Sequence, residues 1–269
     1  MINIIKEIYQ LYLFYCRTPV ESKSIVFYSE HEGYYPYYEG LINELISNRD
    51  IKICYVSSDI NDPIFKNTSE NISTFYIKWL LTIFMQFVNC KVLIMTLPDL
   101  NNYHLKKSIF TVHYIYIFHS LVSIHMMYRL KAFDHYDTIF CAGPHHFNEI
   151  RERENLYGLN KKELVKVGYY RLERIFDQYQ NYKNYAPHQN YLKTILIAPS
   201  WGNENLLKTC GTELIQELIR LDYSVIVRPH PETLKRDPQL IDNIIKTFYE
   251  NKLFKIETSV HSDDSIIKS

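Results

Sequence analysis

Glycine is scarce in this chain: there are 7 among 269 residues, and none forms a glycine-rich loop of the kind that cradles phosphates. The five cysteines stand singly, without a Cys-x-x-Cys pair or a histidine–cysteine cluster at zinc-ligand spacing. No Asp-x-Asp pair stands at the end of an expected strand. We therefore expect no metal site and no cofactor, and the odd, dispersed cysteines favour a reducing cytoplasm.

An excess of charge of one sign is also missing. Lysine plus arginine and aspartate plus glutamate count 30 each, and no basic tract indicates a nucleic-acid partner. Long apolar runs are absent as well, because the most apolar window, 79–97, is interrupted by Gln86, Asn89 and Lys91. That window predicts a buried helix followed by a buried strand, in preference to a membrane-spanning helix.

Short apolar runs and helical patterns alternate along the chain. The first pattern, 2–16, predicts a helix that docks on its own domain, in preference to one lying on a membrane surface. Runs rich in β-branched residues predict strands at 24–28, 51–57, 91–96, 109–112, 115–118, 138–142, 164–167, 194–198, 224–227 and 254–257. Helical spacing predicts helices at 37–48, 77–88, 121–132, 145–155, 206–221 and 238–251. This alternation predicts an α/β fold with parallel sheets.

The polar stretch 177–193 is the best candidate for a linker, because it is rich in asparagine and glutamine. It predicts two doubly wound, Rossmann-like domains, 1–184 and 185–269. In such folds ligands gather at the carboxyl ends of the strands, so we expect a cleft between the domains near residues 119, 200 and 230.

The stretch 225–232 carries the strongest chemical signal, because a buried strand ends there in Arg-Pro-His-Pro. Pro229 and Pro231 fix the backbone on both sides of His230 and oppose a helical continuation. The imidazole is then held beside Arg228, whose guanidinium suits forked contact with phosphate oxygens. The alternative is a plain strand followed by a proline-rich turn.

Four short segments, taken in order, resemble a known family. They are His119-Ser120, Gly168-Tyr169-Tyr170-Arg171, Ala198-Pro199-Ser200-Trp201 and Arg228-Pro229-His230-Pro231. Together they resemble the bacterial CDP-glycerol glycerophosphotransferases, which include teichoic acid primases and polymerases and related capsule enzymes. The resemblance runs from about residue 24 onward, and it implies the two-domain fold called GT-B.

Two departures from the family pattern bear on these expectations. The family usually shows His-Gly where this chain has His119-Ser120. Its members also continue past 262–265 into a strand ending in Asp-x-Ser, which helps to hold the donor phosphates, whereas this sequence ends at Ser269. We therefore expect an incomplete second domain and little transferase activity from the chain as given.

The resemblance implies transfer of a glycerol phosphate, or a related polyol phosphate, from a CDP-activated donor. The acceptor would be a teichoic acid or a capsular or surface glycan. His119 would be the catalytic base, and His230 would act on the donor phosphates. The alternatives are a GT-B sugar-nucleotide glycosyltransferase or epimerase, and an inactive truncated remnant.

Further site residues follow from the same resemblance and from position at strand ends. Ser200, Trp201 and Arg228 would bind the donor together with His230, and Glu30 and Ser120 would face the acceptor. For Arg171 at the hinge there are two interpretations, a side chain that reaches the cleft and an exposed linker arginine, and we favour the second. His145-His146 is interpreted as the capped start of a helix.

A family acceptor is lipid-linked or membrane-proximal. The expected location is therefore the cytoplasm, peripheral on the inner face of the cell membrane.

Overall fold

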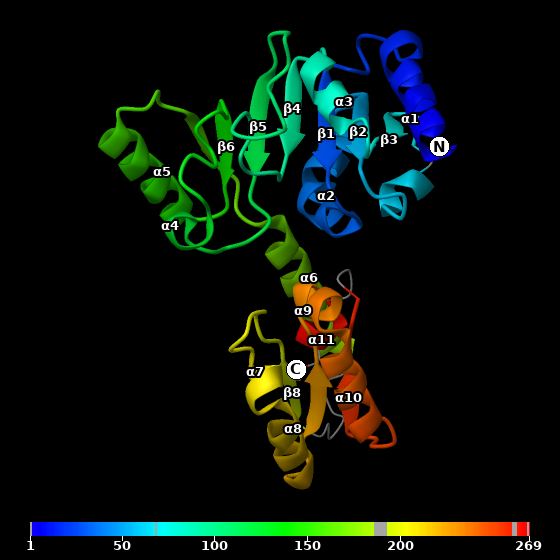
Figure 1. The fold of residues 1–269 in the computed structure, drawn as a ribbon, viewed down its shortest axis with the longest axis vertical. Helices are drawn as coiled ribbons and strands as arrows, with labels where there is room; N and C mark the ends of the chain where they lie inside the picture. Colours follow the sequence, from blue (N-terminus) through cyan, green and yellow to red (C-terminus); the bar gives the residue numbers. More distant parts are fainter. Residues whose placement is uncertain (1, 68, 186–192, 260–262, 268) are drawn as a thin grey trace. The chain divides into compact units, whose positions relative to one another are not determined.

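The computed structural model describes residues 2–67, 69–185, 193–259, 263–267 and 269. The chain forms two compact units, Met1–Arg171 and Leu172–Ser269, each with its own parallel sheet (Figure 1). The predicted α/β fold class is thereby confirmed. The predicted boundary at 184/185 adjoins residues 186–192, which lie outside the described residues. That boundary stays a prediction, as does the cleft between the domains.

The first unit is built on seven parallel strands in the order β3-β2-β1-β4-β5-β6-β7. Its central strands are near-continuous apolar runs, as expected of strands covered on both faces; every residue of β2 is buried. Because all strands run the same way, the loops that follow them share one edge of the sheet. The strands are β1 Ile25–Ser29, β2 Ile53–Ser57, β3 Ile72–Tyr76, β4 Val92–Met95, β5 His113–Ile117, β6 Thr138–Cys141 and β7 Glu163–Lys166.

Helices cover both faces of this sheet, and their ends follow the local sequence. Helix α5 begins with Pro144 in its first turn and ends at Gly158, whose φ of 60° is a left-handed conformation that glycine adopts without strain. The helices are α1 Ile2–Tyr12, continued by a π-helical turn Leu13–Arg17, α2 Tyr35–Asn43, α3 Leu81–Phe87, α4 Ile124–Met127 and α5 Pro144–Tyr157. Helix α6, Tyr170–Tyr185, begins at the end of this unit and belongs for the most part to the second. In the described part of the chain, no helix is long and apolar enough to cross a membrane.

The second unit packs helices against three parallel strands in the order β10-β9-β8. Its core lies between β9 and the apolar faces of two helices and includes Ile215, Val225, Val227 and Ile241. Its elements are β8 Thr194–Ile197, α7 Leu206–Thr209, α8 Gly211–Arg220, β9 Ser224–Val227, α9 Pro231–Arg236, α10 Pro238–Phe248, β10 Phe254–Ile256 and α11 Asp264–Ile267.

The polar stretch predicted as a linker is helical as far as Tyr185, as the last part of α6, and 186–192 lie outside the described residues, so the linker stays a prediction. One prediction about a chain break was wrong. The prolines around His230 were expected to prevent a helix, but Pro231 begins α9. Proline suits the first helical turn, because its missing N–H would have no partner there.

Three further elements differ from the predicted ones. Residues 109–112 form no strand, because this segment is held by hydrogen bonds to the end of α3, such as Ile109 N to Gln86 O at 3.0 Å. The helix expected at 121–132 is confined to α4. Glu149 caps its start by accepting from Ile124 N at 2.5 Å, and the backbone of Tyr128 is extended, with φ −105° and ψ 148°, which ends it. Strand β3 was missed, since most of its residues are only half-buried.

Candidate functional site

Four polar segments lie at the carboxyl edge of the larger sheet. Glu30 follows β1, Asp59 lies in the loop after β2, Thr96 follows β4, and His119 lies just after β5. Since β1, β4 and β5 are neighbours in the sheet, Glu30, Thr96 and His119 emerge from adjacent strand ends. This is the edge at which ligands of open α/β sheets collect.

The imidazole of His119 is enclosed by tyrosine rings. Ring centroids of Tyr34, Tyr37 and Tyr128 lie 5.1, 6.1 and 6.5 Å from it. Burial lowers the pKa of His119 to about 4, and a hydrogen bond with the Thr96 backbone opposes this shift in part. The ring is therefore neutral at pH 7. Its Nδ1 is buried without a hydrogen-bond partner among the described residues, so a proton-accepting nitrogen is unused.

The loop of His119 is also held by tyrosine hydroxyls. Tyr169 donates its hydroxyl to the His119 carbonyl at 2.9 Å. The Ser120 hydroxyl lies 3.3 Å from that of Tyr128, which also lies 3.5 Å from the Tyr116 hydroxyl. Thus two of the four segments singled out in the sequence, around residues 119 and 169, are in direct contact in the first unit.

Arg171 is not the exposed linker side chain that was expected. It is half-buried, its Nη1 donates to the Tyr37 hydroxyl at 2.8 Å, and its guanidinium lies 5.6 Å from the Tyr37 ring centroid. Tyr37 also lies 5.8 Å, centroid to centroid, from Tyr169. Arg171 therefore fixes one of the rings that enclose His119. Sequence reasoning singled out the segment of Tyr169 but missed Tyr34, Tyr37 and Tyr128, because only the fold brings these rings together.

Glu30 is half-buried, and burial raises the pKa of its carboxyl from 4.5 to about 7. Burial raises the pKa values of Tyr28, Tyr38 and Tyr136, and the negative charge of Glu30 adds to each shift, which places the carboxyl near these phenols. Hydrogen bonds hold the fully buried Tyr38 in place: its hydroxyl donates to the Tyr28 carbonyl at 2.7 Å and lies 3.2 Å from Thr96 Oγ1. Glu30 can exchange a proton near neutral pH.

In the second unit, His230 caps the first turn of α9. Its Nδ1 accepts from Glu232 N at 3.1 Å, so the neutral ring carries its proton on Nε2. Burial lowers the pKa of His230, which keeps this neutral form at pH 7. The ring therefore offers one N–H donor. The ring centroids of His230 and Trp201 lie 6.4 Å apart. The Arg236 guanidinium lies over the Trp201 ring, 4.8 Å from its centroid.

Arg228 contacts protein groups at the end of β9. Its Nη1 lies 3.1 Å from Ser265 Oγ and 3.9 Å from a Glu257 carboxylate oxygen, and all three side chains are largely buried. These contacts join the ends of β9 and β10 to α11, so Arg228 supports the loop of His230 in this structure. Ser200 is exposed on the loop after β8.

Asn205 was missed in the sequence, although it holds that loop in place. Its side chain donates to Thr233 Oγ1 at 3.1 Å and accepts from Leu207 N at 2.8 Å. Asparagine one residue before a helix is a capping signal, and it could have identified this position. The loop of Ser200 and Trp201 is thereby fastened to α9, which carries His230 at its cap.

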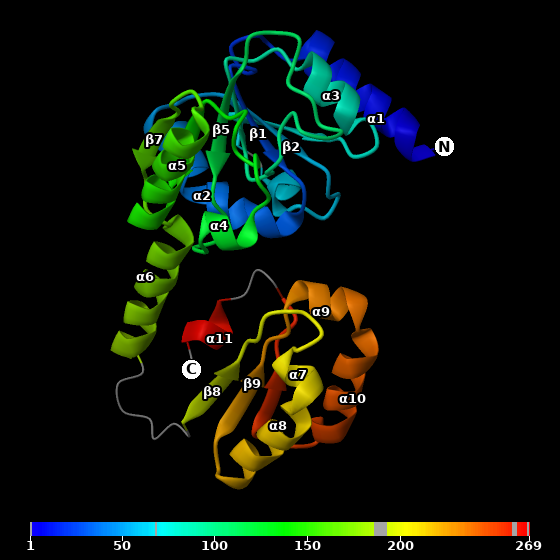
Figure 2. The same cartoon turned by 60° about the vertical axis from the view of Figure 1, so that its left-hand side comes forward.

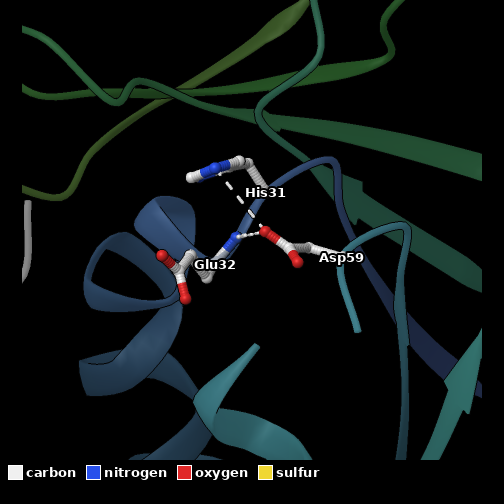
Figure 3. A group of neighbouring side chains, drawn as sticks. All are labelled: His31, Glu32 and Asp59. Carbon is white, nitrogen blue, oxygen red and sulfur yellow. Dashed lines mark hydrogen bonds and ion pairs between the residues drawn. The ribbon is translucent and has the colours of Figure 1, made fainter. Parts of the chain in front are cut away.

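One group among the described residues brings metal-binding side chains together: His31, Glu32 and Asp59 (Figure 3). Their ligand atoms lie within 4.8 Å of one another. His31 Nδ1 accepts from Gly33 N at 3.1 Å, which places the ring proton on Nε2, 3.5 Å from Asp59 Oδ2. That same oxygen accepts from Glu32 N at 3.2 Å. These bonds connect the loop after β1 to the loop after β2, which accounts for the group without a metal ion. That the chemistry needs no metal stays a prediction.

Comparison with known proteins gives structural matches alone, since neither a family model nor a curated protein matches the chain. The wall teichoic acid polymerase TagF, in crystals soaked with CDPG, is 16% identical with a TM-score of 0.57, over 100% of this chain and 69% of that one. S. aureus MnaA with UDP is 10% identical with a TM-score of 0.57, over 91% and 70%. UDP-GlcNAc 2-epimerase from Neisseria meningitidis, bound to UDP-GlcNAc, is 11% identical with a TM-score of 0.50, over 90% and 74%.

At these identities the likeness concerns the fold. The matches extend across both parallel sheets, since they cover nine-tenths of the chain or more. The chain therefore has a GT-B-like α/β fold, shared with a teichoic acid polymerase and with nucleotide-sugar epimerases.

Proposed function

We propose that this protein transfers a glycerol phosphate, or a related polyol phosphate, from a CDP-activated donor to a teichoic acid or a capsular or surface glycan. The observation that supports this most is the contact between the His119 and Tyr169 segments, with a neutral imidazole between tyrosine rings. Those segments carry the resemblance to the glycerophosphotransferases. The fold shared with TagF is consistent with it.

In the proposed reaction an acceptor hydroxyl attacks the phosphorus that carries the glycerol. The new bond joins the acceptor oxygen to phosphorus, and the bond from phosphorus to the bridging oxygen breaks, which releases CMP. His119 Nδ1 accepts the hydroxyl proton. A pKa of about 4 makes this nitrogen a weak base, which suits a loose transition state in which the proton moves late. Glu30 and Ser120 would face the acceptor.

The donor would be held by the second unit. His230 would donate its Nε2–H to a phosphate oxygen, and a neutral donor serves the ground state and the transition state alike. Trp201 would cover the nucleotide, with Ser200 beside it. Arg228 supports the loop of His230 through its hydrogen bond to Ser265. His230→Ala would therefore weaken donor binding as well as turnover.

The proposed location is the cytoplasm, peripheral on the inner face of the cell membrane. The donor is a cytoplasmic nucleotide, and the acceptor that the resemblance implies is linked to lipid. A hydrophobic or lipid-linked acceptor would meet the enzyme only at that surface.

The deciding experiment measures CMP release from CDP-glycerol with a glycan acceptor, for the wild-type chain, His119→Ala and His104→Ala. His104 is an exposed histidine of the same unit and serves as the matched control. We expect His119→Ala to lose about 10²- to 10⁴-fold in rate, as is typical for a general base, while donor binding by titration calorimetry is unchanged. Full turnover by His119→Ala would refute the assignment.

The same preparation tests a second candidate, a nucleotide-sugar epimerase, which the fold shared with the UDP-GlcNAc 2-epimerase from Neisseria meningitidis supports. Incubation with UDP-GlcNAc, followed by separation of the sugar epimers, would show it. Epimer formation without CMP release from CDP-glycerol would replace the proposed function.

A further inference from the structure

The first turn of helix α5 carries a fully buried histidine, His146, which the proposed reaction does not use. Its ring lies nearly face to face with the ring of Phe118, with centroids 3.7 Å apart and an angle of 21° between the planes. Phe118 comes directly before His119 in the chain. His146 therefore packs against the residue from which the loop of His119 begins.

The same imidazole is hydrogen-bonded to the chain beyond His119. Its Nε2 lies 3.0 Å from the carbonyl oxygen of Val122. A carbonyl oxygen can only accept, so Nε2 carries the ring proton and donates it. Burial lowers the pKa of His146, which keeps this neutral form at pH 7. One side chain thus contacts residues on both sides of the proposed base.

A second side chain of α5 holds the residues that follow. Glu149 lies three positions after His146, on the same face of the helix, and accepts from Ile124 N at 2.5 Å. Both views show α5 beside α4, the helix that Ile124 begins (Figures 1 and 2). The segment 118–124 is therefore fastened to α5 at Phe118, Val122 and Ile124.

Histidine meets two requirements at position 146. Phenylalanine could stack on Phe118 but would donate no hydrogen bond, and asparagine could donate to Val122 but has no ring. Histidine also carries a cost, because its Nδ1 is buried without a hydrogen-bond partner among the described residues. An apolar side chain would fill the same space without this cost. The cost is explained if the placement of 118–122 matters to the site.

We propose that His146 is a positioning residue for His119. It holds the segment 118–122 so that the His119 imidazole stays enclosed by the rings of Tyr34, Tyr37 and Tyr128. Release of this segment would let the imidazole move out between the rings into water.

The consequence for the reaction rests on the proposed function, in which His119 is the base. A base that leaves its place meets the acceptor hydroxyl less often in the reactive geometry, so turnover falls. Donor binding would not change, because the groups proposed to hold the donor belong to the second unit.

The first test needs no substrate. Histidine rings labelled with ¹⁵N are observed by NMR at pH 5, and the signal of His119 is identified as the one that His119→Ala removes. With a pKa of about 4, the wild-type ring should be about one-tenth charged. In His146→Phe and His146→Asn it should be at least about half charged, because a released ring is hydrated and protonates more readily. An unchanged His119 signal in the folded variants would overturn the proposal.

The matched control is His113→Phe. His113 begins β5, the strand whose other end leads to His119, and its Nε2 lies 2.7 Å from Thr138 Oγ1. The change therefore removes a histidine hydrogen bond from the same strand, away from the segment 118–124. The His119 signal should match the wild type. A change as large as that of His146→Phe would show that His119 responds to any weakening of the fold, and would also overturn the proposal.

A further variant decides the matter if the His146 variants fail to fold. Glu149 is only half-buried, and Glu149→Ala removes the fastening at Ile124. Loss of a negative charge alone would lower a histidine pKa, so a larger charged fraction of His119 identifies release of the segment. A charged fraction equal to or below that of the wild type would overturn the proposal.

The second test measures CMP release from CDP-glycerol with a glycan acceptor. His146→Phe and His146→Asn should lose about tenfold or more in kcat, with the KM for CDP-glycerol within about twofold of the wild type. His113→Phe should keep both values. Wild-type kcat in the His146 variants would overturn the proposal. If the wild type itself releases no CMP, the proposed function fails, while the NMR experiment still decides whether His146 positions His119.

Discussion

At the scale of single residues, the candidate site holds two titratable groups whose pKa values move in opposite directions. Burial disfavours the charged form of each: it lowers the pKa of His119 to about 4 and raises that of Glu30 to about 7. Both side chains are therefore mostly uncharged at pH 6. Environments that push paired groups toward neutrality are typical of sites that transfer protons.

The Glu30 shift makes a prediction about stability. Between pH 4.5 and about 7 the folded state keeps a proton on Glu30 that the unfolded state has lost, so this group stabilises the fold at low pH and ceases to do so as pH rises through 7. Glu30→Gln removes the ionised form. We expect the variant to gain stability over wild type above pH 7, by at most about 3 kcal/mol, with little gain at pH 4.5.

The measurement is urea unfolding of wild type and Glu30→Gln at pH 4.5, 6 and 8. Taking the difference between the two proteins cancels His119, whose lowered pKa makes its own contribution fall as pH decreases from 6.5 to 4. A difference that is constant with pH would show that the Glu30 carboxyl is solvated.

At the scale of elements, α1 depends on one buried carboxylate. Glu7 accepts from two backbone N–H groups of the segment before α3. Glu7→Ala leaves both donors without this partner, and we expect a loss of about 2–5 kcal/mol in the free energy of unfolding. Glu7→Gln keeps one acceptor oxygen and should lose less. Thermal unfolding with equal midpoints for wild type and Glu7→Ala would contradict this role.

The contact of α2 with the start of α6 depends on Gly40, which has no side chain. A Cβ placed on Gly40 would lie 2.7 Å from Cγ of Tyr170, closer than real contacts allow. Gly40→Ala should therefore destabilise the chain by about 1–3 kcal/mol through overpacking. In a Tyr170→Ala background the same change should be neutral or stabilising, because alanine favours a helix. A double-mutant cycle on urea unfolding measures the coupling, and additive effects would show that Tyr170 moves away freely.

Most elements could be predicted from sequence because their signals are local. The β-branched run 224–227, for example, predicts a buried strand without reference to the rest of the fold, and it forms β9. The predictions failed where a sequence signal fits two structures, or where an element has no clear signal. Pro231 was interpreted as a breaker, although it stands at the first turn of α9, and β3 alternates too weakly because it is at a sheet edge.

The candidate site was predictable only in part, for a related reason. His119 and His230 stand at strand ends, which the strand signal locates. The tyrosines around His119 come from segments separated by up to 135 residues, and no local pattern encodes such a contact. The hydrogen bond between Arg228 and Ser265 also depends on the fold, so the supporting role of Arg228 was not visible in the sequence.

At the scale of the whole molecule, each unit has its own hydrophobic core. Separate cores predict separate unfolding transitions in calorimetry. CDP-glycerol should raise the midpoint of the transition that belongs to the second unit, since a ligand stabilises the state that binds it, and His230→Ala should abolish that shift. Glu7→Ala should lower the other transition alone. A single transition that both variants move would contradict this assignment.

The fastening of α1 has a consequence for limited proteolysis. A protease cleaves a helix only after the helix opens locally, because cleavage needs backbone that has left its hydrogen bonds. Glu7 and Tyr15 hold α1 and its continuation against the segment that includes α3. Peptide bonds within α1 should therefore resist cleavage for as long as the first unit stays folded.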